Sequence, residues 1–173
     1  MYRRSLVDTL VKRIHESRRF IQMLIGPRQT GKSTAIKQAL QESTIPYHIA
    51  LATIGDASMD WLRAQWQQAR NLITEANPSV LLVIDEIQLV TQWSGVVKEL
   101  WDEDTWAERD VRVVLSGSSS VLIKKGLQEG LTGRFEIIRS THWSYQECRD
   151  AFGYSLENFL FFGGYPGGAS LID

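Results

Sequence analysis

A loop with the sequence GPRQTGKST, Gly26 to Thr34, most constrains what this chain can fold into. The apolar segment FIQMLI comes directly before it, and apolar residues at helical spacing follow from Ala35 to Leu40. In a loop of the form G-x-x-x-x-G-K-[ST], glycines let the backbone curl so that successive N–H groups face one anion. The sequence therefore predicts a strand, an anion-binding loop and a helix as one unit.

Each part of this loop has a chemical role toward the phosphates of a nucleotide. The helix that starts near Lys32 directs the positive end of its dipole at phosphate groups. The ammonium group of Lys32 reaches the β- and γ-phosphates, and the Ser33 hydroxyl is a suitable ligand for Mg²⁺. The predicted nucleotide-binding residues are Gly26, Pro27, Arg28, Gln29, Thr30, Gly31, Lys32, Ser33 and Thr34. The loop itself does not distinguish ATP from GTP.

The rest of the chain alternates between two kinds of apolar pattern. Predicted strands lie at residues 20–25, 47–51, 80–84, 111–115 and 135–140. Helical spacing of apolar residues occurs at residues 6–14, 35–40, 60–73 and 93–101. This alternation indicates an α/β protein with a parallel sheet, and the continuous run VLLVI is typical of a strand covered on both faces. Ligands of such sheets bind outside the carboxyl ends of the strands.

Two further polar clusters follow predicted strands and are expected beside the loop. Asp85 and Glu86 come directly after VLLVI. A carboxylate there can hold Mg²⁺, so Asp85 is the predicted metal ligand together with Ser33, and Glu86 is the predicted general base. The alternative is a solvated acidic turn, which the neighbouring loop makes less favoured.

A serine-rich segment, Ser116 to Ser120, follows the strand predicted at 111–115. Ser116, at the last strand position, or Ser118 is a candidate to orient the attacking water or contact the γ-phosphate. The alternative is a Ser/Gly turn that caps a helix beginning in SVLIKK. The pattern leaves both interpretations open, with Ser116 slightly favoured.

Arg134 stands just before the last predicted strand. Its fixed positive charge suits an arginine finger that stabilises a transferring phosphoryl group, in its own subunit or in a neighbouring one. An ordinary ion-paired surface arginine is the alternative, and the residues alone favour it.

The overall charge of the chain limits the classes of partner. The net charge is −1 over 173 residues, which gives no global attraction to nucleic acid or anionic membranes. The N-terminal region is locally basic, with Arg3, Arg4, Lys12, Arg13, Arg18 and Arg19. A nucleic-acid contact is one interpretation of that region, and a solvated helix face is the favoured one. The aliphatic runs are too short to span a bilayer, and we expect a cytoplasmic protein.

Six segments in order carry a resemblance to a known family: GPRQTGKST, VLLVIDEIQ, VVLSGSSS, LTGRFE, HWSYQE and FLFFGGYP. From about Phe20 to Pro166 the chain resembles the AAA+-like P-loop ATPases of bacteria and archaea, in which a nuclease-like domain often follows. The resemblance implies a three-layer α/β sandwich whose parallel five-stranded sheet has the order 5-1-4-3-2. It assigns Lys32 and Ser33 to Walker A, Asp85 and Glu86 to Walker B, and implies ATP as the nucleotide.

The same resemblance extends to two more residues and to the end of the chain. It places Ser116 at the sensor strand, where relatives often carry Thr or Asn, and makes Arg134 a catalytic or sensor arginine. It implies one ATPase domain, with an amphipathic helix at 1–19, a core at 20–140 and the start of a helical region at 141–173. Because the sequence stops at Asp173, little or no helical lid is expected. No catalytic role is assigned to HWSYQE.

Hydrolysis of Mg-ATP to ADP and phosphate, to drive or regulate a partner protein, is the leading functional prediction. One alternative is a nucleotide-dependent switch with weak hydrolysis. A small-molecule kinase is less favoured, because the tandem Asp-Glu suits water activation and the segment LQEGLTGR offers few positive charges. A homo-oligomer is expected if Arg134 acts on a neighbouring subunit.

Overall fold

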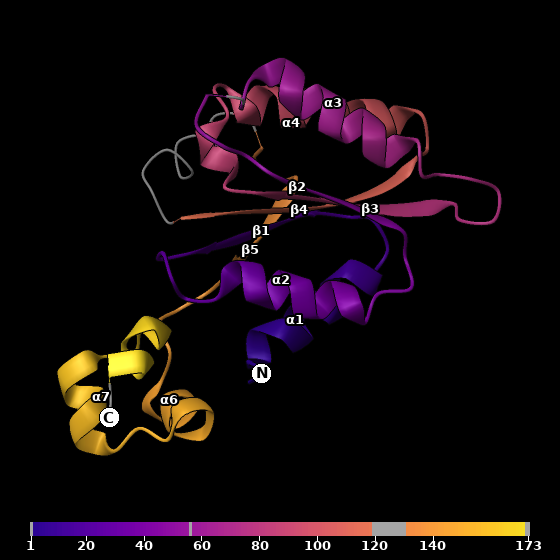
Figure 1. Cartoon of the computed structure of the whole chain (residues 1–173). Helices are drawn as coiled ribbons and strands as arrows, with labels where there is room; N and C mark the ends of the chain where they lie inside the picture. The colour runs from indigo at the N-terminus through magenta and orange to yellow at the C-terminus, as the bar shows by residue number, and fades with distance from the viewer. Residues whose placement is uncertain (1, 56, 119–130, 172–173) are drawn as a thin grey trace.

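The computed structural model describes residues 2–55, 57–118 and 131–171. Its centre is a sheet of five parallel strands in the order β2-β3-β4-β1-β5 (Figure 1). The strands are β1 (Ile21–Gly26), β2 (Tyr47–Leu51), β3 (Ser79–Asp85), β4 (Asp110–Ser118) and β5 (Phe135–Arg139). This is the order 5-1-4-3-2 that the family resemblance implies, so the predicted fold class is confirmed.

Helices cover both faces of the sheet and make a three-layer sandwich (Figure 1). The α-helices are α1 (Ser5–His15), α2 (Lys32–Gln41), α3 (Met59–Arg70), α4 (Trp93–Trp106), α6 (Tyr145–Phe152) and α7 (Leu156–Phe162). Two short 3₁₀ helices are η1 (Ile87–Leu89) and η2 (Pro166–Leu171). Helices α1 and α2 pack on one face of the sheet, and α3 and α4 pack on the other.

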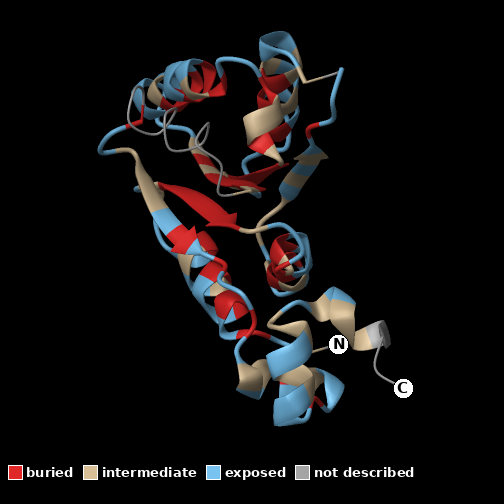
Figure 2. Cartoon of the chain, turned by 90° about the vertical axis from the view of Figure 1, so that its left-hand side faces the viewer, coloured by how far each residue is buried: buried red, intermediate tan, exposed pale blue. Residues whose placement is uncertain are grey.

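Strand β3 shows why the run VLLVI has no polar position. Leu81 and Val83 belong to the core formed with α1 and α2, whereas Leu82 and Ile84 belong to the core formed with α3 and α4. Alternate side chains of a strand point to opposite faces, so a strand covered on both faces needs apolar residues throughout. Figure 2 shows the buried residues gathered on the sheet and on the helix faces turned toward it.

Several boundaries differ from the sequence prediction. Strand β4 continues through Ser118 instead of ending at residue 115, because residues 116–118 pair in register with residues 24–26 of β1. Helix α1 spans Ser5–His15 instead of 1–19, since Glu16 has extended backbone angles that end it. Helix α3 ends at Arg70 instead of residue 73. Ser119, Ser120 and the helix expected from SVLIKK lie outside the described residues.

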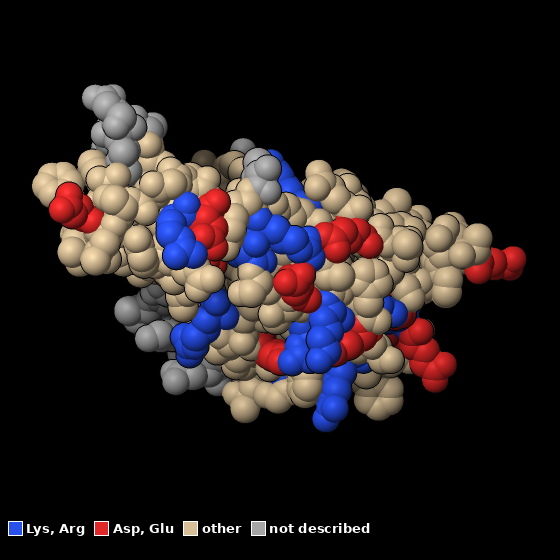
Figure 3. Space-filling view, turned by 90° about the horizontal axis from the view of Figure 1, so that it is seen from below, with Lys and Arg blue, Asp and Glu red and all other residues tan. Residues whose placement is uncertain are grey.

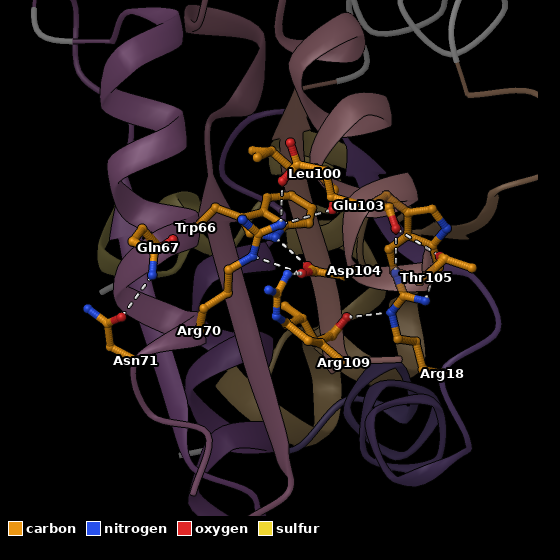
Figure 4. A network of polar contacts seen from close by, with 12 residues as sticks. Arg18, Trp66, Gln67, Arg70, Asn71, Leu100, Glu103, Asp104, Thr105 and Arg109 are labelled. Atoms are coloured by element: carbon orange, nitrogen blue, oxygen red, sulfur yellow. Dashed lines mark hydrogen bonds and ion pairs between the residues drawn. The ribbon is translucent and has the colours of Figure 1, made fainter. Parts of the chain in front are cut away.

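A buried carboxylate, Asp104 of α4, links α4 to α3 (Figure 4). Its side chain is fully buried and accepts hydrogen bonds from Trp66 Nε1 at 2.7 Å and Arg70 Nε at 2.8 Å. Arg109 Nη1 lies 3.3 Å from the same carboxylate. These donors satisfy the buried charge, which is costly to leave unpaired.

Asp104→Ala is expected to lower the free energy of unfolding by about 3–5 kcal/mol, because it leaves the Arg70 charge and the Trp66 N–H without their shared partner. Urea denaturation followed by circular dichroism measures this change. Glu103→Ala is the matched control, since Glu103 pairs with Arg70 at 3.0 Å from an exposed position. That control is expected to cost at most about 1 kcal/mol, and equal losses in both variants would contradict the role of burial.

Candidate nucleotide-binding site

The three polar clusters predicted from the sequence meet at the carboxyl ends of β1, β3 and β4. Ser33 Oγ donates a hydrogen bond to Asp85 Oδ2 at 2.6 Å, and Ser116 Oγ donates to Asp85 Oδ1. Strand β4 lies between β1 and β3 in the sheet, so the topology brings the three ends to one edge. The expected convergence of the clusters is therefore confirmed, although they are up to 83 positions apart between Ser33 and Ser116.

The loop between β1 and α2 depends on glycine at two positions. A Cβ atom on Gly26 would lie 2.0 Å from the carbonyl oxygen of Ser140, which follows β5. Gly31 has a φ of +85° and is the N-cap residue of α2, a left-handed conformation that glycine adopts without strain. Helix α2 begins directly after Gly31, and the N-terminus of a helix favours an anion held by the preceding loop.

Lys32 is buried at the base of this loop. Its Nζ atom donates to the carbonyl oxygens of Gly26 at 3.0 Å and Pro27 at 2.7 Å. Burial lowers the pKa of Lys32, and the nearby carboxylates of Glu86 and Asp85 partly oppose this effect. An ammonium group held among oxygen acceptors in this way is suited to phosphate oxygens.

The remaining loop residues divide into exposed and buried positions. Arg28, Gln29 and Thr34 are exposed, and Gln29 has a φ of +61°. Thr30 is buried, and its hydroxyl donates to the Pro27 carbonyl at 3.0 Å. The side chains of Arg28, Gln29 and Thr34 therefore face solvent, whereas Thr30 packs in the interior of the protein.

Asp85 and Ser33 together offer the ligand type that Mg²⁺ prefers. Both present oxygen atoms, and the Asp85 carboxylate is buried and oriented by the Glu86 N–H at 3.0 Å. Magnesium in nucleotide sites takes one or two protein oxygens and completes its shell with water and phosphate. In the described parts of the chain no group of three or more His, Cys, Asp or Glu side chains is placed to hold a metal. The residues present therefore fit a magnesium ion that arrives with a nucleotide.

Glu86 has an unusual backbone conformation next to Asp85. Its φ of 56° and ψ of 39° are left-handed, which is uncommon for a residue other than glycine. Its carboxylate accepts a hydrogen bond from Gln88 Nε2. The Gln88 Oε1 atom is buried and makes no hydrogen bond with the described residues. Strained backbone conformations such as that of Glu86 occur most often at functional sites. Gln88 is a further residue of this site that the sequence motifs did not single out, although it belongs to the segment VLLVIDEIQ.

Ser116 and Ser118 occupy different positions on β4. Ser116 is fully buried and bonded to Asp85, whereas Ser118 is the last strand residue and pairs with Gly26. The sequence predicts Ser116 as the last strand residue, but pairing with β1 continues the strand two residues further, to Ser118. Of the two serines, Ser116 is the one in contact with the Asp85 cluster.

Arg134 is not brought to the loop of its own chain. Its backbone carbonyl accepts a hydrogen bond from the N–H of Ile21, the first residue of β1, whereas the loop begins at Gly26, the last. A rise of about 3.3 Å per residue places these two ends about 17 Å apart. The guanidinium instead pairs with Asp102 of α4 at 2.8 and 3.0 Å, and these hydrogen bonds raise the pKa of Arg134.

Three of the N-terminal arginines pair with acidic neighbours. Their ion pairs are Arg3–Asp8, Arg3–Glu42, Arg4–Glu147, Arg13–Glu16 and Arg13–Glu136. Arg18 donates to the Trp101 carbonyl at 2.8 Å and lies 3.6 Å from the centroid of its ring. Figure 3 shows Lys and Arg side chains interspersed with Asp and Glu on the face of α1. This mixed surface weakens the case for nucleic-acid binding by the basic region.

Three residues outside the loop hold Thr30 in place, and local sequence patterns do not reveal them. Arg4 Nη1 and Trp143 Nε1 both donate to the Thr30 carbonyl, at 3.0 and 3.1 Å, and Ser140 Oγ donates to its hydroxyl at 3.0 Å. Trp143 stands in the segment HWSYQE, to which the sequence analysis assigned no catalytic role. Nothing in local periodicity links Arg4 to a loop 26 positions away.

Comparison with known proteins places this site in a family. A sequence model described as an AAA domain matches residues 18–149, which is most of the chain and includes the loop, Asp85, Glu86, Ser116 and Arg134. A search of curated proteins gives no match. Among the described residues, no helix is long and apolar enough to cross a membrane. The strand order, the loop geometry and the matched family agree, and the chain therefore belongs to the AAA domains, a family of P-loop ATPases.

Proposed function

We propose that this chain binds Mg-ATP at residues 26–34 and hydrolyses it to ADP and phosphate, to drive or regulate a partner protein. The observation that carries the proposal is the hydrogen-bonded series Ser33–Asp85–Ser116 with Glu86 beside it. This series gathers the phosphate loop, a carboxylate for the metal and a neutral hydroxyl at one edge of the sheet.

In this proposal each residue has a separate role. The loop N–H groups and Lys32 bind the phosphates. Ser33 and Asp85 would hold the magnesium ion, and the ion would supply positive charge to the phosphate oxygens. Glu86 accepts a proton from the attacking water. Ser116 fixes the orientation of the Asp85 carboxylate through its hydrogen bond.

Arg134 fits this mechanism only from a neighbouring copy. The length of β1 separates it from the loop of its own chain, while its partly exposed guanidinium, paired with Asp102, lies at the opposite end of the strands. We therefore propose a homo-oligomer in which Arg134 of one subunit stabilises the transferring phosphoryl group bound by the next.

One observation favours a nucleotide-dependent switch as the second candidate. The Glu86 carboxylate is held by Gln88 Nε2, and this hydrogen bond competes with a water molecule for the base. A protein with this contact kept in place binds the nucleotide and hydrolyses it slowly.

Nucleotide binding and phosphate release test the proposal directly. The wild-type protein is expected to bind mant-ADP and to release phosphate from Mg-ATP in a reaction abolished by EDTA. Lys32→Ala is expected to weaken mant-ADP binding about tenfold to hundredfold, because it removes a charged hydrogen-bond donor. Lys37→Ala, at an exposed position of the same helix, is the matched control.

Three outcomes of this experiment separate the candidates. Binding with phosphate release supports the ATPase, and a specific rate that rises with protein concentration supports the homo-oligomer. Binding with phosphate release at background overturns the ATPase and supports the switch. Absence of mant-ADP binding by the wild-type protein overturns both.

A further inference from the structure

The carbonyl oxygen of Thr30 is held by two donors that belong neither to the loop nor to the sheet. Arg4 Nη1 reaches it from the segment before α1 at 3.0 Å. Trp143 Nε1 reaches it from the segment after β5 at 3.1 Å. Both bonds are buried, so neither competes with bulk water. Two distant parts of the chain thus converge on one backbone atom of the nucleotide loop.

Arg4 is itself tied to the C-terminal segment. Its guanidinium pairs with Glu147 at 2.8 and 3.3 Å and donates to the Thr141 carbonyl at 3.3 Å. It also lies 5.0 Å from the centroid of the Trp143 ring. Burial disfavours the charge of Glu147, but hydrogen bonds from Arg4 and Ser144 outweigh it and lower the pKa of Glu147. At neutral pH the ion pair is therefore fully formed.

The same glutamate begins helix α6. Glu147 accepts from the Ser144 N–H at 2.8 Å, and Ser144 Oγ accepts from the Glu147 N–H at 3.2 Å, which is a reciprocal capping box. Arg4 is thus bonded at once to the loop carbonyl and to the residue that fixes the start of α6. Arg4 therefore connects the start of α6 to the Thr30 carbonyl through direct hydrogen bonds.

Trp143 connects the loop to the rest of the C-terminal segment. Its backbone N–H donates to the Gly164 carbonyl at 3.0 Å, and it forms a small buried cluster with Cys148 and Tyr154. In Figure 1, α6 and α7 lie apart from the helices that cover the sheet. No residue of α7 is buried, but its Phe159 and Phe162 pack against the Trp143 cluster.

We propose that Arg4 and Trp143 are positioning residues of the nucleotide loop, through which the docking of residues 141–171 sets the affinity for nucleotide. A phosphate-binding loop needs its N–H groups turned toward the anion and its carbonyl oxygens turned elsewhere. Two external donors on the Thr30 carbonyl hold one such oxygen in place. Coupling of this kind is reciprocal, so bound nucleotide stabilises the docked C-terminal segment by the same factor.

This inference rests on nucleotide binding at the loop, but it does not require hydrolysis. Mant-ADP affinity is therefore the first measurement, with Trp143→Phe as the variant, because Phe keeps an aromatic six-membered ring at this position and removes the N–H donor with the rest of the indole. The dissociation constant is expected to rise about fivefold, the range for one lost hydrogen bond. Trp106→Phe is the matched control, since Trp106 is 89% exposed at the end of α4.

Arg4→Lys supplies a second, independent variant. Lysine keeps the charge opposite Glu147 and loses the planar fork that bonds Thr30, Thr141 and Glu147 together. Its mant-ADP affinity is also expected to fall about fivefold. With ATP as substrate, both variants are expected to raise KM with little change in kcat, because the lost contact stabilises binding of substrate and transition state equally.

Amide hydrogen exchange distinguishes coupling between the nucleotide and the C-terminal segment from a purely structural role of Trp143. In the wild-type protein, saturating ADP is expected to slow amide exchange in residues 141–152, and in Trp143→Phe this slowing is expected to be lost. The inference is overturned if both variants bind mant-ADP with an affinity within twofold of wild type. It is also overturned if ADP does not change the amide exchange rates of residues 141–152 in the wild-type protein. If the wild type does not bind mant-ADP, the proposed function fails first.

Discussion

Glu86→Gln is expected to lower phosphate release from Mg-ATP about 10²–10⁴-fold, the usual contribution of a general base, while mant-ADP affinity stays close to wild type. Gln has the same shape as Glu but cannot accept the proton of the attacking water. Both side chains meet the same cost at a φ of 56°, so the substitution does not change backbone strain. Single-turnover phosphate release, with nucleotide binding measured in parallel, checks the result.

Glu75→Gln makes the same chemical change at an exposed position and is the control for the loss of one negative charge. A rate for Glu86→Gln within tenfold of wild type would show that another group activates the water. If mant-ADP affinity falls together with the rate, Glu86 instead supports the loop, for example through its attraction to the Lys32 ammonium. Retained binding with lost turnover is the result that fits a base.

Arg134→Ala is expected to lower ATP hydrolysis about 10³-fold or more, the range for an arginine finger, and to leave mant-ADP affinity unchanged. Because Arg134 lies at the far end of β1 from its own loop, we expect a direct effect on the phosphoryl group to come from a neighbouring copy. Mixing Arg134→Ala with Lys32→Ala is therefore expected to restore part of the activity. In the mixture, one variant supplies the nucleotide site and the other supplies the arginine.

Asp102→Asn distinguishes this role from a structural one. Asp102 holds the Arg134 guanidinium through two hydrogen bonds, and this contact must open before the arginine can reach another subunit. If the ion pair only supports the fold, Asp102→Asn and Arg134→Ala will lower activity equally. If Arg134 acts in trans, Asp102→Asn keeps or raises activity, and mixed variants recover it. If mixing the variants restores no activity, and Asp102→Asn and Arg134→Ala lose activity equally, Arg134 has no part in the mechanism.

Much of the fold and the centre of the site were accessible from the sequence by itself. The run VLLVI is apolar at every position because β3 is covered on both faces, and this local property predicts a central strand. Parallel strands end at one edge of the sheet, so residues that follow them, such as Ser33, Asp85 and Ser116, were expected to meet. The hydrogen bonds between them confirm that expectation.

Only the tertiary structure decided where charged and aromatic residues outside the motifs belong. The sequence showed a basic N-terminus, but the folded chain pairs Arg3, Arg4 and Arg13 with acidic residues from other elements. It also placed Arg134 at the end of the sheet opposite the loop of its own chain, and Trp143 against Thr30. The physical reason is that periodicity reports which face of an element is buried, whereas an ion pair or a hydrogen bond depends on which distant side chain packs beside it.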